Sequence, residues 1–286
     1  MYPTDEMASL RRALANGRLI PYLGPATLEL AGSAQSVPAS PEALAAVLTA
    51  RATVPHKIRG NLTAAAQFIE NFKHRKTISK LMSETFAPSA PPSRLHLLLA
   101  ELAPLPLVVT AWYDDTVQST LAGRDDWGMV QGVSHAEHRD GWFRYYDAQG
   151  RESSADVAAT WATLLYQPLG SVRPAANFLV SDSDFVEVLT EIDIQTPIPP
   201  LVQERRRERG FLFLGMRFNT QLERNFARQI MKRSGGPHFA VLHGPTTRNE
   251  ARFITEQDIV RIDMPLADFT AALAGIDLAA GMAVAI

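Results

Sequence analysis

The chain has 286 residues, of which 46% are hydrophobic and 20% are charged, and its formal net charge is −2. These values are typical of a globular protein with a sizeable core, and they argue against a disordered chain and against a strongly basic surface for nucleic acid. The sequence contains no cysteine, which excludes disulfides, zinc–thiolate sites, iron–sulfur clusters and cysteine nucleophiles.

Neither a signal peptide nor a membrane anchor is predicted. Residues 1–6 include two acidic side chains and no apolar core, and no uninterrupted apolar run approaches the length of a membrane span. We therefore expect a cytoplasmic protein.

The first hundred residues are predicted to be mainly helical. A short helix at 10–14 precedes an apolar strand at 19–23, and the helices that we expect next lie at 41–48, 62–72 and 78–86. A proline-rich connector at 87–93 ends at Ser93, which is placed to cap a leucine-rich helix. His96 lies beside the apolar face of that helix, so we predict a structural role for it.

From residue 107 onward, short apolar runs alternate with helical segments. Strands are predicted at 107–109, 164–166, 178–180, 211–214, 239–242 and 260–262, and helices at 116–121, 184–189, 222–231 and 266–273. This alternation predicts a mainly parallel sheet covered by helices on both faces. The more polar segment 124–160, with a strand and turn at 143–150, is interpreted as a small inserted lobe packed over the sheet of a single domain, residues 1–286.

Glycines and polar residues follow several of these strands. Gly24 follows the strand at 19–23, Thr110 and Asp114 follow the strand at 107–109, and Gly215 follows the strand at 211–214. In open α/β sheets, ligands bind at the carboxyl ends of the strands. We therefore expect these four residues to lie near one another in a crevice at one edge of the sheet.

Five segments, in the same order along the chain, resemble those of sirtuin-like NAD-binding domains. Residues 107–115 are similar to the family's Thr-Thr-Asn-Tyr-Asp motif, 19–28 to its first strand and Gly-Ala-Gly-x-Ser loop, and 165–172 to its Lys-Leu-His-Gly-Ser segment. Residues 178–185 and 211–218 resemble later strands, so the similarity covers roughly residues 17 to 270. The resemblance implies a Rossmann-like α/β fold. The absence of cysteine separates the chain from deacylase-type sirtuins, whose small lobe carries a four-cysteine zinc site.

The same resemblance locates differences at the catalytic positions. Trp112 stands where the family has its catalytic Asn, and Leu169 stands where it has its catalytic His. Leucine cannot transfer protons, and one general acid–base group supplies about 10²–10⁴-fold in rate. We therefore expect no appreciable NAD hydrolysis, with Asp114 as the remaining weak catalytic candidate.

NAD or ADP-ribose is the cofactor that the resemblance implies, and no metal is expected. The residues carried over as candidate cofactor contacts are Gly24, Ala26, Thr27, Thr110, Tyr113, Asp114, Gly170 and Gly215. Two replacements weaken the phosphate loop, because Ala26 replaces the family's second Gly and Leu28 replaces its Ser.

Each of the main candidates also has a structural interpretation. Gly24 is compatible with an ordinary strand-to-loop turn, and Pro25 removes one amide donor from the loop. Asp114 is placed to cap the following helix. Trp112 is suited to filling the core or to stacking on a ring, and core filling is favoured.

Trp112 and Leu169 are expected to approach each other and to fill the nicotinamide end of the crevice. A surviving nucleotide site is then expected in the adenine-phosphate half, near Gly24, Gly215 and the strand end at 242–244.

Two further charged segments have weaker interpretations. His135 and His138 have the spacing of one helical face and could ligate a metal, but no third ligand is evident, so a solvated polar loop is favoured. Residues 204–209, Glu-Arg-Arg-Arg-Glu-Arg, could touch phosphate or an acidic partner, and a solvated helix end is favoured for them.

Three hypotheses for the function follow. The favoured one is a catalytically degenerate sirtuin-like domain that binds a nucleotide or acts as a scaffold. The second is an active NAD glycohydrolase, like the standalone sirtuin-like domains of bacterial antiphage systems. The third is a protein-interaction module with a closed pocket. A protein partner or a homo-oligomer stays open, whereas a membrane or nucleic-acid partner is not expected.

Overall fold

A nine-stranded sheet forms the centre of the computed structural model, which describes residues 4–102, 104–138, 141–194 and 198–275. The strand order is β11-β10-β9-β1-β2-β6-β3-β4-β5. Seven neighbouring strands run parallel: β11 (Ile259–Ile262), β10 (His238–Val241), β9 (Gly210–Leu214), β1 (Leu19–Leu23), β2 (Leu107–Thr110), β6 (Thr163–Gln167) and β3 (Trp127–Gly132). Two antiparallel strands, β4 (Phe143–Asp147) and β5 (Glu152–Ser153), complete one edge.

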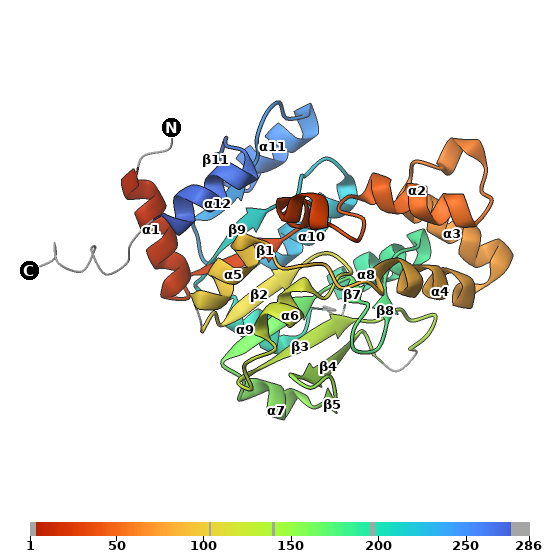
Figure 1. The fold of residues 1–286 in the computed structure, drawn as a ribbon, viewed down its shortest axis with the longest axis horizontal. Coiled ribbons are helices and arrows are strands. Elements are labelled where there is room, and N and C mark those ends of the chain that lie inside the picture. Colours follow the sequence, from red (N-terminus) through yellow and green to blue (C-terminus); the bar gives the residue numbers. More distant parts are fainter. Residues whose placement is uncertain (1–3, 103, 139–140, 195–197, 276–286) are drawn as a thin grey trace, which may run out of the picture.

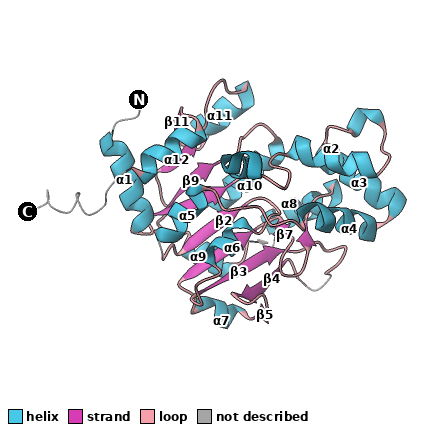
Figure 2. Cartoon of the chain, viewed as in Figure 1, coloured by secondary structure: helices cyan, strands magenta, loops and turns pink. Residues whose placement is uncertain are grey.

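Helices cover both faces of this sheet (Figure 2). Every residue of β1 is buried, and its side chains alternate between two apolar clusters. Leu19 and Leu23 pack with α1 (Thr4–Ala15), α5 (Arg94–Glu101) and α12 (Leu266–Ala274) on one face. Ile20 and Tyr22 pack on the other face, together with side chains of α9 (Pro200–Arg205), α10 (Gln221–Met231) and α11 (Arg248–Glu256). The prediction of a Rossmann-like, mainly parallel sheet is therefore confirmed.

Residues 124–160 are expected to form a lobe packed over the sheet. In the structure they instead extend one edge of the sheet. They supply β3, β4, β5 and the short helix α7 (Ala155–Ala159), and β3 pairs in parallel with β6. The strand β3 is not predicted from the sequence because it contains Gly128 and Gly132, which weaken a strand pattern. Gly128 is required by packing, since a Cβ at this position would collide with the ring of Trp161.

A separate helical lobe is instead built from the amino-terminal third of the chain. It comprises α2 (Pro41–Arg51), α3 (Leu62–Lys73) and α4 (Arg75–Phe86), which gather beyond one end of the sheet, far from α1 (Figure 1). The apolar core of this helical lobe includes Trp112 and Tyr113, which follow β2. Arg75 ties the lobe to α8 (Asp182–Ile194) through an ion pair of 2.7 Å with the buried Asp184.

The remaining elements are short. They are the 3₁₀ helices η1 (Pro25–Ala34) and η2 (His56–Ile58), the helix α6 (Thr116–Leu121) and the hairpin of β7 (Gly170–Ser171) with β8 (Asn177–Phe178). The strand predicted at 178–180 is thus shorter than expected, and it pairs within this hairpin and not in the main sheet. Among the described residues, no helix combines the length and the apolar character needed to cross a membrane.

Candidate functional site

The carboxyl ends of β1, β2 and β9 meet at one edge of the sheet. Gly24 donates its amide to the carbonyl of Leu214 at 2.8 Å, and Ala111 donates to the carbonyl of Leu23 at 2.8 Å. A Cβ added to Gly24 would lie 2.5 Å from the carbonyl oxygen of Gly215, and Thr110 pairs in register with Leu23. The structure therefore brings Gly24, Thr110 and Gly215 together, as the strand ends predict.

The backbone amides of the Gly24 loop are engaged within the protein. In addition to the Gly24 amide, the amide of Ala26 donates to the carbonyl of Gly215 at 2.9 Å, and that of Thr27 donates to the carbonyl of Gly24 at 3.2 Å. Pro25 has no amide proton. Gly215 has a φ of +66°, and a Cβ there would lie 2.5 Å from the nitrogen of Thr27. The two glycines thus allow β9 and η1 to approach each other closely.

A cavity of about 360 Å³ lies between this sheet edge and the helical lobe. Small-molecule sites occupy about 300–1,000 Å³, so the cavity is large enough for a ligand. We call this cavity the crevice. Both Trp112 and Leu169 line it, and Leu169 packs against the apolar cluster that contains Trp112. The crevice beside them is open, and the filling of its nicotinamide end stays a prediction.

The direction of the Trp112 side chain explains why the crevice stays open. Its indole Nε1 donates to the carbonyl of Pro38 at 2.8 Å, and only 3% of the residue is exposed. Its ring centroid lies 5.0 Å from that of Tyr113 and 6.1 Å from that of Phe86. Trp112 is therefore held in the core of the helical lobe and contributes a wall to the crevice.

Aromatic and acidic side chains characterise the lining of the crevice. The aromatic members are Tyr22, Trp112, Tyr113, Phe185 and Phe226. Glu42 and Glu223 are the charged members, and no lysine, arginine or histidine is among the described residues that line the crevice. Burial raises the pKa of the Glu223 carboxyl; hydrogen bonds from Thr220 oppose this shift, and the charges of Glu250 and Glu42 add to it.

The comparisons with known proteins bear on this sheet edge. A model of the SIR2-like domain family matches residues 106–262. The chain belongs to this family. No curated protein matches the chain. One solved structure, described as the structural basis for the mechanism and regulation of Sir2 enzymes, is 13% identical, covers 98% of this chain and 99% of its own, and has a TM-score of 0.41.

The region that matches the SIR2-like domain begins immediately before β2. It includes Trp112 and Leu169, whereas the Gly24 loop and the helical lobe precede it. The crevice is therefore bounded on one side by the matched region and on the other by residues 24–63.

The cofactor residues inferred from the SIR2-like resemblance have different locations. Gly24 and Tyr113 line the crevice, and the Tyr113 hydroxyl donates to the carbonyl of Leu179 at 2.7 Å. Burial raises the pKa of Tyr113. The others are not among the residues that line the crevice, and these are Ala26, Thr27, Thr110, Asp114, Gly170 and Gly215.

Asp114 lies directly before Asp115, which is the N-cap residue of α6. The Oδ1 of Asp114 accepts a hydrogen bond of 2.9 Å from the amide of Thr116, the first residue of α6, and 5% of Asp114 is exposed. Burial raises the pKa of the Asp114 carboxyl, and hydrogen bonds from Thr116 partly oppose this rise. Gly170 serves the β7–β8 hairpin, because a Cβ at this position would collide with the carbonyl of Asn177.

Several lining residues of this SIR2-like domain come from helix starts that the sequence analysis does not connect with the site. Glu42 lies in the first turn of α2, Asn61 caps α3, and Thr220 and Glu223 form a capping box at the start of α10. The capping box has a recognisable Thr-x-x-Glu pattern. That pattern predicts a helix start, but not the cavity toward which the start turns.

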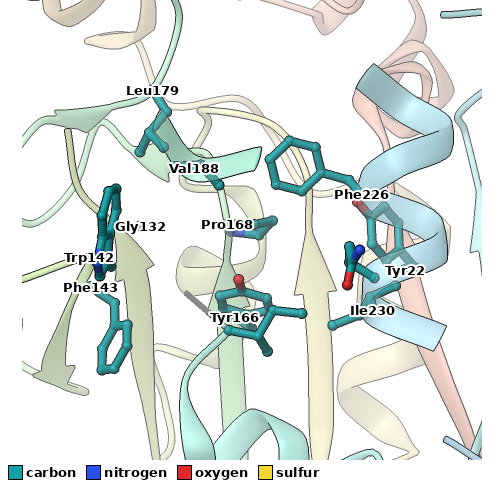
Figure 3. Close-up of a pocket in the computed structure, with 12 residues that line it drawn as sticks. Tyr22, Gly132, Trp142, Phe143, Tyr166, Pro168, Leu179, Val188, Phe226 and Ile230 are labelled. Atoms are coloured by element: carbon teal, nitrogen blue, oxygen red, sulfur yellow. The ribbon is translucent and has the colours of Figure 1, made fainter. Parts of the chain in front are cut away.

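A second, smaller hollow adjoins the crevice and shares Tyr22 and Phe226 with it (Figure 3). Its volume is about 20 Å³, close to the space that one water molecule needs. In Figure 3, Tyr166 lies between Trp142 on one side and Tyr22 on the other. Burial raises the pKa values of both Tyr22 and Tyr166.

His135, considered above as a metal ligand, and His96 both contact neighbouring side chains of the fold. The His135 ring stacks on Trp142 with centroids 3.5 Å apart, and Glu137 forms an ion pair of 3.3 Å with Arg75. Among the residues that the structure describes, no group of three or more His, Cys, Asp or Glu could hold a metal ion. His96 is buried and completes a capping box with Ser93, and burial lowers its pKa to about 4.

The expectation that residues 204–209 form a solvated helix end is wrong for three of the arginines. Arg206 is 3% exposed and donates to the carbonyls of Gln229 and Ile230 at the end of α10. Arg205 donates to the carbonyl of Pro106 at 2.7 Å, and Arg209 donates to the carbonyl of Gly17 at 2.8 Å. The last carbonyls of a helix lack intrahelical partners, so guanidinium groups bind there favourably.

Proposed function

We propose that this SIR2-like domain binds a small ligand in the crevice and does not hydrolyse NAD. The observation that carries the proposal is an open cavity of about 360 Å³ whose walls include Trp112 and Leu169. The resemblance places these two residues at the positions of the family's catalytic Asn and His. Neither side chain can accept a proton or position a nucleophile. The remaining acids of the lining are Glu42 and Glu223, and Glu223 is engaged by Thr220 in a capping box.

NAD or ADP-ribose is the ligand class that the family suggests first. The volume of the crevice is compatible with the nucleoside part of such a ligand. The diphosphate part has no partner of the expected kind, because the amides of Gly24, Ala26 and Thr27 are engaged and no basic side chain lines the crevice. The described residues therefore do not fit the complete dinucleotide, and we derive no reaction step through it.

The alternative of an active NAD glycohydrolase makes the opposite prediction for a direct assay. We expect purified protein to release no nicotinamide from NAD above the blank over several hours. Turnover near one per second, which lies within the usual range of enzymes, would overturn the proposal. Such a result would require a catalytic base other than Trp112 and Leu169.

The double variant Trp112→Asn, Leu169→His tests whether the two positions alone limit the reaction. We expect it to remain inactive, because the amides of the Gly24 loop still bind protein carbonyls in this variant. Ligand binding is measured separately by thermal unfolding with NAD, NADP and ADP-ribose. A ligand at 100 times its Kd stabilises the folded state by about 2.7 kcal/mol.

The third hypothesis, a protein-interaction module with a closed pocket, is less well supported. A closed pocket requires that side chains occupy the crevice, whereas Trp112 turns toward Pro38 and leaves the space open.

A further inference from the structure

The distribution of charge around the crevice opposes a phosphate group. Glu42 and Glu223 contribute carboxylates, and the described lining contains no lysine, arginine or histidine. The loop closest to the family's phosphate position has no free amide between Gly24 and Thr27. A phosphate in the crevice would therefore be desolvated beside two like charges, and no cationic side chain of the described lining would compensate its charge.

Three helix starts at the crevice would by themselves favour an anion. The starts of α2, α3 and α10 all contribute lining residues, and each helix amino terminus carries about +0.5 of an elementary charge. However, Glu42 and Glu223 each lie in the first turn of their helix and bring a full negative charge to it. The side chains of Asn61 and Thr220 also occupy cap positions, each accepting a backbone amide. Each of these caps occupies one backbone amide, and the acids of α2 and α10 oppose an anion at two of the three helix starts.

The same lining is well suited to an uncharged or cationic ring that carries hydroxyl groups. Aromatic faces such as those of Tyr22, Trp112 and Phe226 provide large apolar contact areas for a ring, and they attract cations. An ionised carboxylate accepts hydrogen bonds and donates none, so it suits the hydroxyl groups of a ribose. The amide and the hydroxyl of Thr220 both donate to Oε2 of the Glu223 carboxylate, which leaves Oε1 for a ligand.

We propose that the crevice selects a phosphate-free nucleoside over the corresponding nucleotide, with Glu223 accepting a ribose hydroxyl. This inference rests on the proposed function, because it requires that the crevice binds a ligand. It differs from what the family suggests, since the phosphate becomes a feature that the site rejects.

Two matched pairs of probes test the inference on the full chain by isothermal titration. Nicotinamide riboside and nicotinamide mononucleotide differ by one phosphate, and so do adenosine and adenosine monophosphate. We expect each detectable nucleoside to bind at least 10-fold more tightly than its monophosphate. A monophosphate that binds as tightly as its nucleoside, or more tightly, would overturn the inference.

Variants of α10 identify the residues responsible. Glu223→Gln should weaken the nucleoside at least 5-fold and narrow the difference between nucleoside and monophosphate, whereas Glu84→Gln, a control on the exposed side of α4, should change neither. Leu222→Arg places a cation in the lining and should strengthen monophosphate binding about 10-fold. Unchanged selectivity in both α10 variants, with thermal unfolding showing that they fold, would contradict the assigned role of Glu223.

The outcomes separate the two proposals. Tight binding of the monophosphates without nicotinamide release would overturn the nucleoside inference and leave the proposed function standing. Failure of all four probes, and of NAD, NADP and ADP-ribose, to bind would overturn the proposed function and the inference together.

Discussion

The crevice has a glycine side, with Gly24 and Gly215, and an apolar side, with Trp112 and Leu169. The resemblance to sirtuin-like domains singles out residues on both sides, but their roles in this structure differ. On one side, Gly24 and Gly215 keep glycines that the resemblance to sirtuin-like domains emphasises, but the chain uses them for the close contact of β9 with η1. On the other side, Trp112 and Leu169 are the residues that the resemblance places at the family's catalytic positions, and the space beside them is open.

This contrast teaches that neither a retained glycine nor an apolar replacement reveals the state of a binding site. A glycine is needed wherever two backbones approach closely, whether or not a ligand is present. A bulky aromatic residue closes a cavity only if its ring points into the cavity, and the Trp112 indole is directed by its hydrogen bond to Pro38.

The largest effect on the free energy of unfolding is expected when Trp112 and Leu169 are each truncated to alanine. Trp112→Ala should destabilise the protein by about 4 kcal/mol, because it removes a buried aromatic side chain from the core of the helical lobe. Leu169→Ala should cost only about 1 kcal/mol, since Leu169 is partly exposed and borders open space. Urea unfolding followed by circular dichroism measures both values. Equal costs would mean that Leu169 is as deeply packed as Trp112 and that the crevice is filled in solution.

The sequence predicts most of the elements because local signals determine them. The apolar run of β1, Pro41 at the start of α2 and the Ser93 cap of α5 all lie within a few residues of the element that they define. The strand β3 is missed because its glycines make room for Trp161, which is 33 residues beyond Gly128, and no local pattern contains that contact.

The candidate site is predicted less completely than the fold. Strand ends correctly bring Gly24 and Gly215 together, because parallel strands share one carboxyl edge. The acidic lining is missed, because Glu42 and Glu223 are ordinary first-turn acids whose common cavity depends on how α2 and α10 pack. The buried Arg206 is missed for a similar reason, since its partners are carbonyls at the end of α10.

An intermediate effect is expected on the glycine side of the crevice. Gly215→Ala should destabilise the protein by about 3 kcal/mol, because it combines the strain of a positive φ with a collision against Thr27. Gly244→Ala is the matched control, since Gly244 has a φ of +78° and no atom within 4 Å of an added Cβ. We expect about 1 kcal/mol for this control. Similar values for the two variants in urea unfolding would show that β9 and η1 are not in close contact.

The smallest effect is expected for the pH dependence of stability that the Glu223 carboxyl contributes. The folded-state pKa of Glu223 is raised above the ordinary value of 4.5, so the folded protein binds more protons than the unfolded chain between these two pKa values. Stability that depends on protonated Glu223 is present at pH below 4.5 and is lost as the pH rises through the folded-state pKa. The stability of the native protein relative to Glu223→Gln should therefore fall between pH 4 and pH 8, by less than about 1 kcal/mol because solvent still screens this partly buried carboxylate.

The charged groups around Glu223 determine whether stability falls as the pH rises. Glu42 and Glu250 raise its pKa, Thr220 donates to it, and the Glu250 carboxylate is itself paired with Arg217 at 2.6 Å. Glu42→Gln should therefore reduce the pH dependence, because it removes one of the two repelling charges. If the native protein instead gains stability relative to Glu223→Gln as the pH rises, a cation compensates Glu223 in solution. The crevice would then be able to accept a phosphate, and its glycine side would resemble the family's phosphate site in function as well as in sequence.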